Sequence, residues 1–402
     1  MGCLVAARTV SETVPAHAEI RVETVSDYQA FLDLEPVWNE VAEAAGLDHP
    51  FLEHAWVRAW WECFGAGSAL RVLVVKAGDQ AVAIAPLILT PCRMWGIKVR
   101  RLGFFYNAHV PRADFLIARR PTEAYCAIWN HLYQTRDWDV LQLCQLPERS
   151  ATLEAMTDLA EQDDCQIVTW LSGASPYLPL SSSWDEYINS LAGKHRANLR
   201  NRLKRLNGIG TVEVETIAST SEEKLTGALE AGLQLEAAAW KGASGTAISS
   251  DPDVSRFYST LAPRAAAKGW MRLHFLRTGS KRMAFDFSLE YKHRTYLLKN
   301  GYDPAYAPYS PSNLLLFKIL QSLFERGDVR EYDFLGESGD WKLQWTKLSR
   351  PHYWLFVFPS TFKGRLLHFI KSRLIPLLKQ NSLQPMRNLA LRLAARAQPG
   401  RR

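Results

Sequence analysis

A strand, an interrupting loop, a helix and a second strand follow one another within residues 294–335, and this order constrains the fold of the 402-residue chain most strongly. "RTYLLKN" alternates like a strand, "GYDPAYAPYSPSN" interrupts it, an apolar helix is expected from Pro311 to about Arg326, and "REYDFL" is a short strand. Two strands joined through a helix usually lie parallel in one sheet. The stretch therefore predicts an α/β (α+β) fold that contains a parallel crossover unit.

Similar elements recur in the first half of the chain. "FLEHAWVRAWWECF" predicts an amphipathic helix, and "LRVLVVKAGDQAVAIAPLIL" predicts a strand pair that turns at Gly78, as a later pair turns at Gly279. A cluster of Ser, Pro and Gly at 172–184 favours a boundary between two related halves, each a mixed sheet flanked by helices. We predict four segments: a flexible leader at 1–19, a first domain at 20–175, a second domain at 180–360, and a basic amphipathic tail at 361–402.

The composition is that of a globular protein, with 47% hydrophobic and 22% charged residues. The six cysteines lack CxxC pairs and the ten histidines lack an HExxH pairing, so we expect reduced thiols and no metal site. The first 20 residues lack the basic n-region of a signal peptide, and no run of 18 apolar residues predicts a transmembrane helix. We therefore expect a cytoplasmic protein.

The positive charge is concentrated at the C-terminus. No acidic residue follows Asp340, whereas 13 Lys and Arg residues do, out of 48 in a chain of net charge +7. Residues 362–402 mix apolar and basic positions at helical spacing, which is typical of a helix on an anionic membrane surface. We expect peripheral contact with the inner face of a membrane, the alternative being a basic helix that packs on the protein or is partly disordered.

A second basic segment, "GKHRANLRNRLKRLNGIG" (193–210), lies between the halves. Its six positive charges, with Arg196 and Arg200 among them, predict a site for a phosphate-bearing ligand, a carrier or an acidic polymer, or else a solvated helix face. "RLNGIG" also fits the R/Q-x-x-G-x-G/A loop that binds coenzyme A pyrophosphate. Such a loop follows a strand and opens a helix, whereas this one ends a helix, so we interpret Gly208 as a helix cap.

The start of the helix after "GYDPAYAPYSPSN" has the order that an anion site requires, because it follows a strand. Ser310 is expected to cap this helix, and Pro311 fits its first turn. The free amides of Ser312 and Asn313 and the positive end of the helix dipole then receive an anion, or water in the simpler alternative. We predict that these four residues bind the cofactor.

Three blocks carry a family resemblance: "LEAAAWKGASGTA" (235–247), "YLLKNGYDPAYAPYSPSNLLL" (296–316) and "YDFLGESGDWKLQW" (332–345). In this order they resemble the CelD-type acetyltransferase-like family with its BioF2-like domain, which belongs to the GNAT superfamily and is related to the FemAB peptidyltransferases. The first half of the chain resembles the same family. This chain departs from it at Ser312, where the family usually has Gly, and at Trp341, where it usually has Tyr.

The resemblance implies two tandem GNAT-like domains and an acyltransferase. Its donor is an acyl thioester, namely acyl-CoA (acetyl-CoA or longer) or an acyl carrier, and its acceptor is an amine or hydroxyl. In the family this chemistry is often associated with exopolysaccharide or cell-envelope biosynthesis. Two alternatives are a FemAB-like transferase that takes an aminoacyl group from tRNA through the basic segment, and a non-catalytic accessory protein of a polysaccharide synthase.

Candidate catalytic residues follow from what acyl transfer requires: a base, a proton donor for the thiolate, and groups that hold the acceptor. Asp303 and Asp333 follow the two parallel strands, so either carboxylate is a candidate base. Simpler alternatives are that Asp303 braces its turn and that Asp333 pairs with Lys342. Tyr309 is a candidate proton donor and Glu236 a further carboxylate. The predicted substrate-binding residues are Trp240, Lys241, Lys342, Trp345, Arg196 and Arg200.

Overall fold

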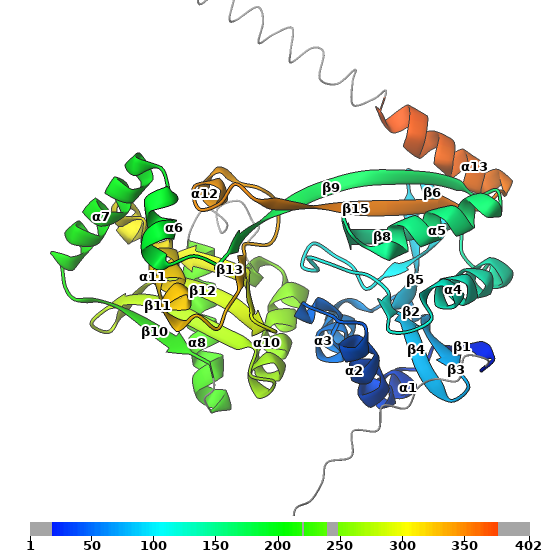
Figure 1. Cartoon of the computed structure of the whole chain (residues 1–402), viewed down its shortest axis with the longest axis horizontal. Coiled ribbons are helices and arrows are strands. Elements are labelled where there is room, and N and C mark those ends of the chain that lie inside the picture. The colour runs from blue at the N-terminus through cyan, green and yellow to red at the C-terminus, as the bar shows by residue number, and fades with distance from the viewer. Residues whose placement is uncertain (1–17, 219–220, 239–247, 377–402) are drawn as a thin grey trace, which may run out of the picture.

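The computed structural model describes residues 18–218, 221–238 and 248–376, which form two lobes joined by long strands (Figure 1). The first lobe contains six helical segments and eight strands among the residues described. The helices are α1 (Tyr28–Asp33), α2 (Glu35–Ala44), the 3-10 helix η1 (Pro50–Leu52), α3 (His54–Phe64), α4 (Pro121–Thr135) and α5 (Ala151–Gln162). The strands are β1 (Ile20–Val25), β2 (Ala69–Leu70), β3 (Val72–Ala77), β4 (Gln80–Ala85), β5 (Leu87–Met94), β6 (Ile97–Phe104), β7 (Leu116–Ile117) and β8 (Val140–Pro147).

The second lobe follows the long strand β9 (Gln166–Pro179). Its strands are β10 (Val212–Ile217), β11 (Met271–Thr278), β12 (Lys281–Tyr291), β13 (Arg294–Tyr302) and β14 (Glu331–Asp333). Its helices are α6 (Trp184–Ser190), α7 (Gly193–Asn207), α8 (Glu222–Ala238), α10 (Pro252–Ala267), α11 (Pro311–Arg326) and α12 (Asp340–Leu343), with the 3-10 segments η2 (Ile248–Ser250) and η3 (Pro304–Tyr309). The chain then returns to the first lobe through β15 (Ser349–Phe358), α13 (Phe362–Phe369) and the π-helical turn η4 (Ile370–Leu374).

The predicted parallel crossover is confirmed. β13 and β14 run parallel, with Arg294 opposite Glu331 and Tyr296 opposite Asp333, and α11 connects them. Local signals explain the helix, because Pro311 occupies its first turn and Gly327, in the left-handed region at φ 69°, ends it. The first lobe repeats the unit, since β6 and β8 are parallel and α4 connects them.

Strand exchange joins the two lobes. Within the described residues, the strands form one sheet of order β1-β3-β4-β7 and one of order β10-β11-β12-β13-β14-β9-β15-β8-β6-β5-β2. β9 pairs with β14 through its last residues and with β15 along most of its length, and β15 also pairs with β8. The last strand of the second half thus completes the first lobe (Figure 1). The boundary predicted at 172–184 falls largely inside β9, so the four-segment division remains a prediction.

Aromatic residues fill the core on both sides of the lobe junction. Trp56 of α3 packs edge-on against Phe257 of α10, with ring centroids 5.4 Å apart, and Phe51 meets Tyr296 of β13 at 5.3 Å. All four side chains are buried. Because each contact joins a first-lobe residue to a second-lobe residue, this shared apolar core fixes how the lobes face each other.

The described part of the basic tail folds back on the first lobe. In α13 the buried residues are Gly364 and Leu367, and the helix lies against β9 and β15. The opposite side of α13 is exposed and carries Phe362, Leu366 and Phe369. None of the helices in the described ranges is both long and apolar enough to cross a membrane.

Candidate functional site

A cleft opens where β13 and β14 part. Their ladder covers only Arg294 to Tyr296 of β13, which then continues to Tyr302 without β14 beside it. A cavity of about 410 Å³ lies at this opening, and we call it the splay cavity. Its polar lining residues are Glu236, Lys299, Asn300, Tyr302, Ser312, Asn313 and Lys342.

The floor of the splay cavity depends on a close approach of α8 to β13 at Gly301. A Cβ atom on Gly301 would lie 2.6 Å from the backbone nitrogen of Glu236 and closer still to its Cα, so only glycine fits there. The Glu236 side chain is buried, and its Oε2 accepts a hydrogen bond from the amide of Ile248 at 2.9 Å. Glu236 therefore lines the splay cavity, with one carboxylate oxygen engaged by the backbone.

A β-bulge shapes β13 beside this cavity. Phe287 of β12 is opposite Lys299 and the next residue, Ser288, is opposite Leu297, so Leu298 is an extra residue in β13. Such a residue is left out of the regular ladder and bends its strand. Leu298 and Lys299 line both the splay cavity and a second cavity.

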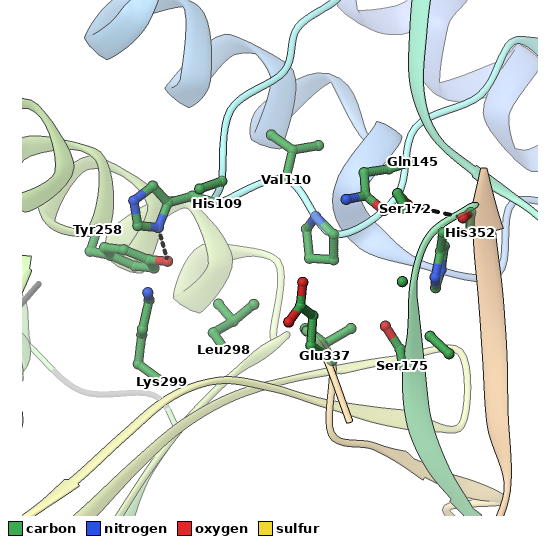
Figure 2. A pocket seen from close by; sticks show the side chains of 16 residues that line it. His109, Val110, Gln145, Ser172, Ser175, Tyr258, Leu298, Lys299, Glu337 and His352 are labelled. Atoms are coloured by element: carbon green, nitrogen blue, oxygen red, sulfur yellow. Dashed lines mark hydrogen bonds between the residues drawn. The ribbon is translucent and has the colours of Figure 1, made fainter. Parts of the chain in front are cut away.

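The second cavity, of about 230 Å³, lies between the lobes, and we call it the junction cavity (Figure 2). The first lobe contributes the 108–111 loop and Gln145 of β8, and the two exchanged strands contribute Ser172 to Ser175 and His352. The second lobe contributes Tyr258, the bulged part of β13 and residues 335–337. Because Leu298, Lys299, Leu335 and Gly336 also line the splay cavity, the two cavities adjoin.

A histidine, a tyrosine and a lysine meet at one end of the junction cavity (Figure 2). Nδ1 of His109 lies 3.1 Å from the hydroxyl of Tyr258, and Nζ of Lys299 lies 5.3 Å from the centre of the Tyr258 ring. Burial and the nearby Lys299 charge lower the pKa of His109 to about 4, and burial raises the pKa of Tyr258. Both side chains are therefore neutral at pH 7.

His352 lies at the other end of the junction cavity and is also neutral. Arg112 Nε donates to its Nε2 at 3.4 Å, and burial, with Arg112 adding to the effect, lowers the pKa of His352 to about 4. Because an arginine side chain only donates, Nε2 must be the accepting nitrogen and the proton lies on Nδ1. His352 therefore has no free lone pair with which to act as a base.

Residues 335–337 form a strained loop between the two cavities. Leu335 and Gly336 both have positive φ, at 49° and 55°. The Leu335 amide donates to Asp333 Oδ1 at 2.8 Å, and Nζ of Lys342 donates to the carbonyl oxygens of Leu335 and Glu337. Lys342 thus lines the splay cavity, and its ammonium also holds this loop. Strain of this kind persists only where surrounding contacts impose it.

The two predicted carboxylate bases lie outside the two cavities. Asp303 caps η3 by accepting a hydrogen bond from the Ala305 amide at 3.0 Å, and it forms an ion pair with Lys281 at 3.1 Å. Asp333 is fully buried between Arg112 and Arg350. Neither aspartate is one of the described residues that line the two cavities. The alternative pairing of Asp333 with Lys342 was wrong, since Lys342 bonds to backbone carbonyls.

The predicted cofactor residues are only partly placed as expected. Ser312 and Asn313 line the splay cavity at the start of α11, next to the buried Pro311. Ser310 adopts a left-handed conformation at φ 49° and makes no side-chain cap, which corrects that prediction. The Asn313 amide donates to the Ser310 carbonyl at 3.0 Å, so it is not free as predicted.

Other predicted residues lie away from the cavities. Trp345 is a buried core residue. Its ring packs edge-on against that of His195 in α7, with ring centroids 4.8 Å apart. Tyr309 lies under the guanidinium of Arg205 at 5.3 Å. Arg196 donates to Asn189 at 2.6 Å, and Arg200 is exposed on α7. Trp240 and Lys241 lie outside the described residues.

Several cavity residues were missed from the sequence: His109, Tyr258, Lys299 and Glu337. Lys299 and Glu337 stand inside the second and third family-like blocks, so their position in those blocks was an available signal. His109 and Tyr258 lie 149 residues apart, and no spacing pattern links them. Across the described ranges, no group of three or more His, Cys, Asp and Glu side chains is placed to hold a metal ion.

Comparisons with known proteins concern mainly the second lobe and the overall fold. Residues 193–343 match the family model described as an acetyltransferase (GNAT) domain. A search of curated proteins gave no match. Among solved structures, the chain is similar to the C-terminal domain (DUF2156) of a putative lysylphosphatidylglycerol synthetase from Agrobacterium fabrum, with 12% identity, a TM-score of 0.51, and coverage of 84% of this chain and 95% of that one.

The crystal structure of FemX is similar at 13% identity and a TM-score of 0.51, over 78% of this chain and 93% of that one. A tandem GNAT protein from the clavulanic acid biosynthesis pathway matches at 12% identity and a TM-score of 0.46, over 84% and 98% of the two chains. At these identities the similarity concerns the fold. The FemX match supports the mixed α/β fold over most of the chain.

Proposed function

We propose that this chain transfers an acyl group from an acyl thioester to an amine or hydroxyl acceptor, because residues 193–343 match an acetyltransferase (GNAT) domain and most of the chain is similar in fold to FemX. The donor is acyl-CoA, either acetyl-CoA or a longer form, or an acyl carrier. The resemblance of the sequence to the CelD-type family supports a role in exopolysaccharide or cell-envelope biosynthesis.

The separation of β13 from β14 in front of α11 is the observation that carries this proposal. The splay cavity lies between the strands, and Ser312 and Asn313 place the first turn of α11 at its edge. The positive end of a helix favours phosphate groups. A donor with phosphates at α11 and its chain along the free edge of β13 would bring its acyl end to the bulge at Leu298.

Two features near the bulge suit the charge that develops during acyl transfer. A bulged residue has backbone groups outside the ladder, and a backbone amide can donate to the oxyanion of a tetrahedral intermediate. The Lys299 side chain lines both cavities and brings a positive charge to the same region. We assign Leu298 and Lys299 to the stabilisation of the carbonyl oxygen.

Replacing Ser312 by glutamate is expected to weaken acetyl-CoA binding at least about tenfold, because the new carboxylate repels the donor phosphates. Folding should be retained, since a carboxylate is favourable in the first turn of a helix. Ser322→Glu, on an exposed position of the same helix, is the matched control. Isothermal titration of both variants and the wild type measures the effect, and equal affinities in all three would rule out phosphate binding at α11.

The basic helix α7 is the feature on which the alternative function, aminoacyl transfer from tRNA, depends. Arg200 is exposed, and α7 packs on α11 and η3, so its charged side faces solvent beside the second lobe. Titration of the protein with acetyl-CoA, a longer acyl-CoA and aminoacyl-tRNA separates the candidates. Binding of tRNA alone would replace our proposal with the aminoacyl transferase, and binding of none would favour the accessory protein.

We also propose that α13 contacts an anionic membrane surface. Phe362, Leu366 and Phe369 recur at helical spacing on its exposed side, where Phe362 is 87% and Phe369 51% accessible. Arg365 and Arg373 are exposed near this stripe. An apolar stripe flanked by cations is the arrangement by which a helix lies in the plane of a membrane interface.

Replacing both Phe362 and Phe369 by glutamate is expected to reduce co-sedimentation with phosphatidylglycerol-containing vesicles about tenfold or more. Each buried phenylalanine stabilises the bound state by about 1.5–3 kcal/mol. Ile209→Glu, at an exposed apolar residue of the second lobe, controls for loss of surface hydrophobicity. Undiminished binding of the double variant would refute the contact.

A further inference from the structure

Glu337 is the acidic group of the junction cavity. It follows β14 in the strained loop, and Figure 2 shows its carboxylate directed toward the middle of the cavity, below the 108–111 loop. Gly173 of β9 lies beside this side chain, since a Cβ there would be in van der Waals contact with Glu337 Cγ at 3.6 Å. The backbone of Glu337 is held by Lys342, whose Nζ lies 2.9 Å from its carbonyl oxygen. A fixed backbone thus presents this carboxylate to the cavity.

No side chain or backbone group in the described ranges forms a hydrogen bond or ion pair with the Glu337 carboxylate. The neighbouring acids of the lobe junction differ, since Glu331 and Asp333 both pair with Arg350. The protein therefore neutralises its structural carboxylates at this junction and leaves Glu337 available to a ligand.

The junction cavity is lined by two charged side chains, Glu337 and Lys299, and by others that carry no charge. His109 and His352 are neutral at pH 7, and Gln145 and the serines of β9 are uncharged. Among the described lining residues, the second charged group at pH 7 is Lys299, which lies beside the Tyr258 ring and also lines the splay cavity. Of these two groups, Lys299 also lines the splay cavity, whereas Glu337 lines the junction cavity alone.

We propose that the junction cavity binds the acceptor and that the acceptor presents a primary amine, held as its ammonium ion against Glu337. This inference rests on the proposed acyl transfer. A carboxylate forms strong charge-assisted hydrogen bonds with an ammonium group, whereas a neutral hydroxyl gains less from it. At about 230 Å³, the cavity is below the usual 300–1,000 Å³ of ligand pockets, so it takes the amine-bearing end of a larger acceptor.

Glu337 then acts as the base of the reaction. The ammonium gives one proton to the carboxylate, and the freed nitrogen lone pair forms a C–N bond with the acyl carbon. The C–S bond breaks and its electron pair leaves with sulfur, which takes up the second proton from nitrogen. The products are an amide and a free thiol, and Glu337 returns its proton to solvent. Lys299 faces the carbonyl oxygen as negative charge develops there.

The test measures thiol release from acetyl-CoA by the full chain. The amine probes are glucosamine and ethanolamine, each with a hydroxyl counterpart that lacks an amine: glucose and ethylene glycol. We expect thiol release with an amine probe but not with its counterpart. Glu337→Gln should lower this rate about a hundredfold, as loss of a base typically does, while the Kd for acetyl-CoA is unchanged. Glu337→Asp should restore part of the rate.

Glu325→Gln is the matched control, since Glu325 is exposed on α11 outside both cavities. Three results would overturn the inference while acetyl-CoA still binds: an undiminished rate in Glu337→Gln, equal turnover of hydroxyl and amine probes, or thiol release that no amine probe stimulates. Failure of the chain to bind acetyl-CoA, a longer acyl-CoA and an acyl carrier would instead overturn the proposed function, and this inference with it.

Discussion

Replacing Asp333 by asparagine is expected to lower the free energy of unfolding by about 3–5 kcal/mol, because it leaves a buried arginine without its counter-charge. The side chains of Asp333 and Arg112 are 0% and 5% exposed, and they form an ion pair across the lobe junction. Arg350 also pairs with Asp333, at 3.0 Å, but keeps Glu331 as a second partner. The uncompensated charge of Arg112 therefore accounts for most of the loss, which urea denaturation measures.

Asp328→Asn provides the control for this substitution. Asp328 pairs with Arg326 at 2.8 Å on the surface, where its side chain is 58% exposed, so its loss should cost less than about 1 kcal/mol. The comparison also separates a structural from a catalytic role. If Asp333→Asn unfolded like the wild type but had lost turnover, Asp333 would regain the role of a base that the sequence assigned to it.

Replacing Gly301 by alanine is expected to lower stability by about 1–3 kcal/mol and to weaken acyl-CoA binding at least about tenfold. The added Cβ would lie 2.6 Å from the Glu236 nitrogen and 2.8 Å from the Leu235 carbonyl carbon. These are backbone atoms, so α8 must move away from β13 and the splay cavity must change shape.

Gly227→Ala offers a matched control on the same helix, α8. A Cβ there meets no atom within 4 Å, and alanine favours a helix over glycine, so stability should not fall. Thermal unfolding and acetyl-CoA titration of both variants make the comparison. Wild-type stability and affinity in Gly301→Ala would show that α8 is free to shift and that the cavity does not depend on this contact.

The crossover unit was predictable because its signals are local. Pro311 in the first turn and Gly327 after the last one set the limits of α11, and strand patterns on either side imply the parallel pair. The same local order correctly set "RLNGIG" aside, since α7 ends at Asn207 and β10 follows. Such features need no knowledge of distant residues.

The roles of individual carboxylates were not predictable in this way. The sequence places Asp333 at the end of a strand, but its partner Arg112 stands 221 residues earlier in a loop of the other lobe. The junction cavity has the same origin, because His109, Gln145 and Glu337 come together only when the lobes pack. Strand alternation indicates which residues share a face, but it does not identify what lies opposite that face.

The position of β15 has a consequence for how the protein is made. This strand lies between β8 and β9, so the sheet of the first lobe lacks an interior strand until residue 358 has been synthesised. Domains usually fold in order as they leave the ribosome. Here the first half must wait, with the edges of β8 and β9 unpaired, for nearly the whole chain to emerge. Two polypeptides obtained by cutting the gene between the halves would therefore each lack a strand that the other carries.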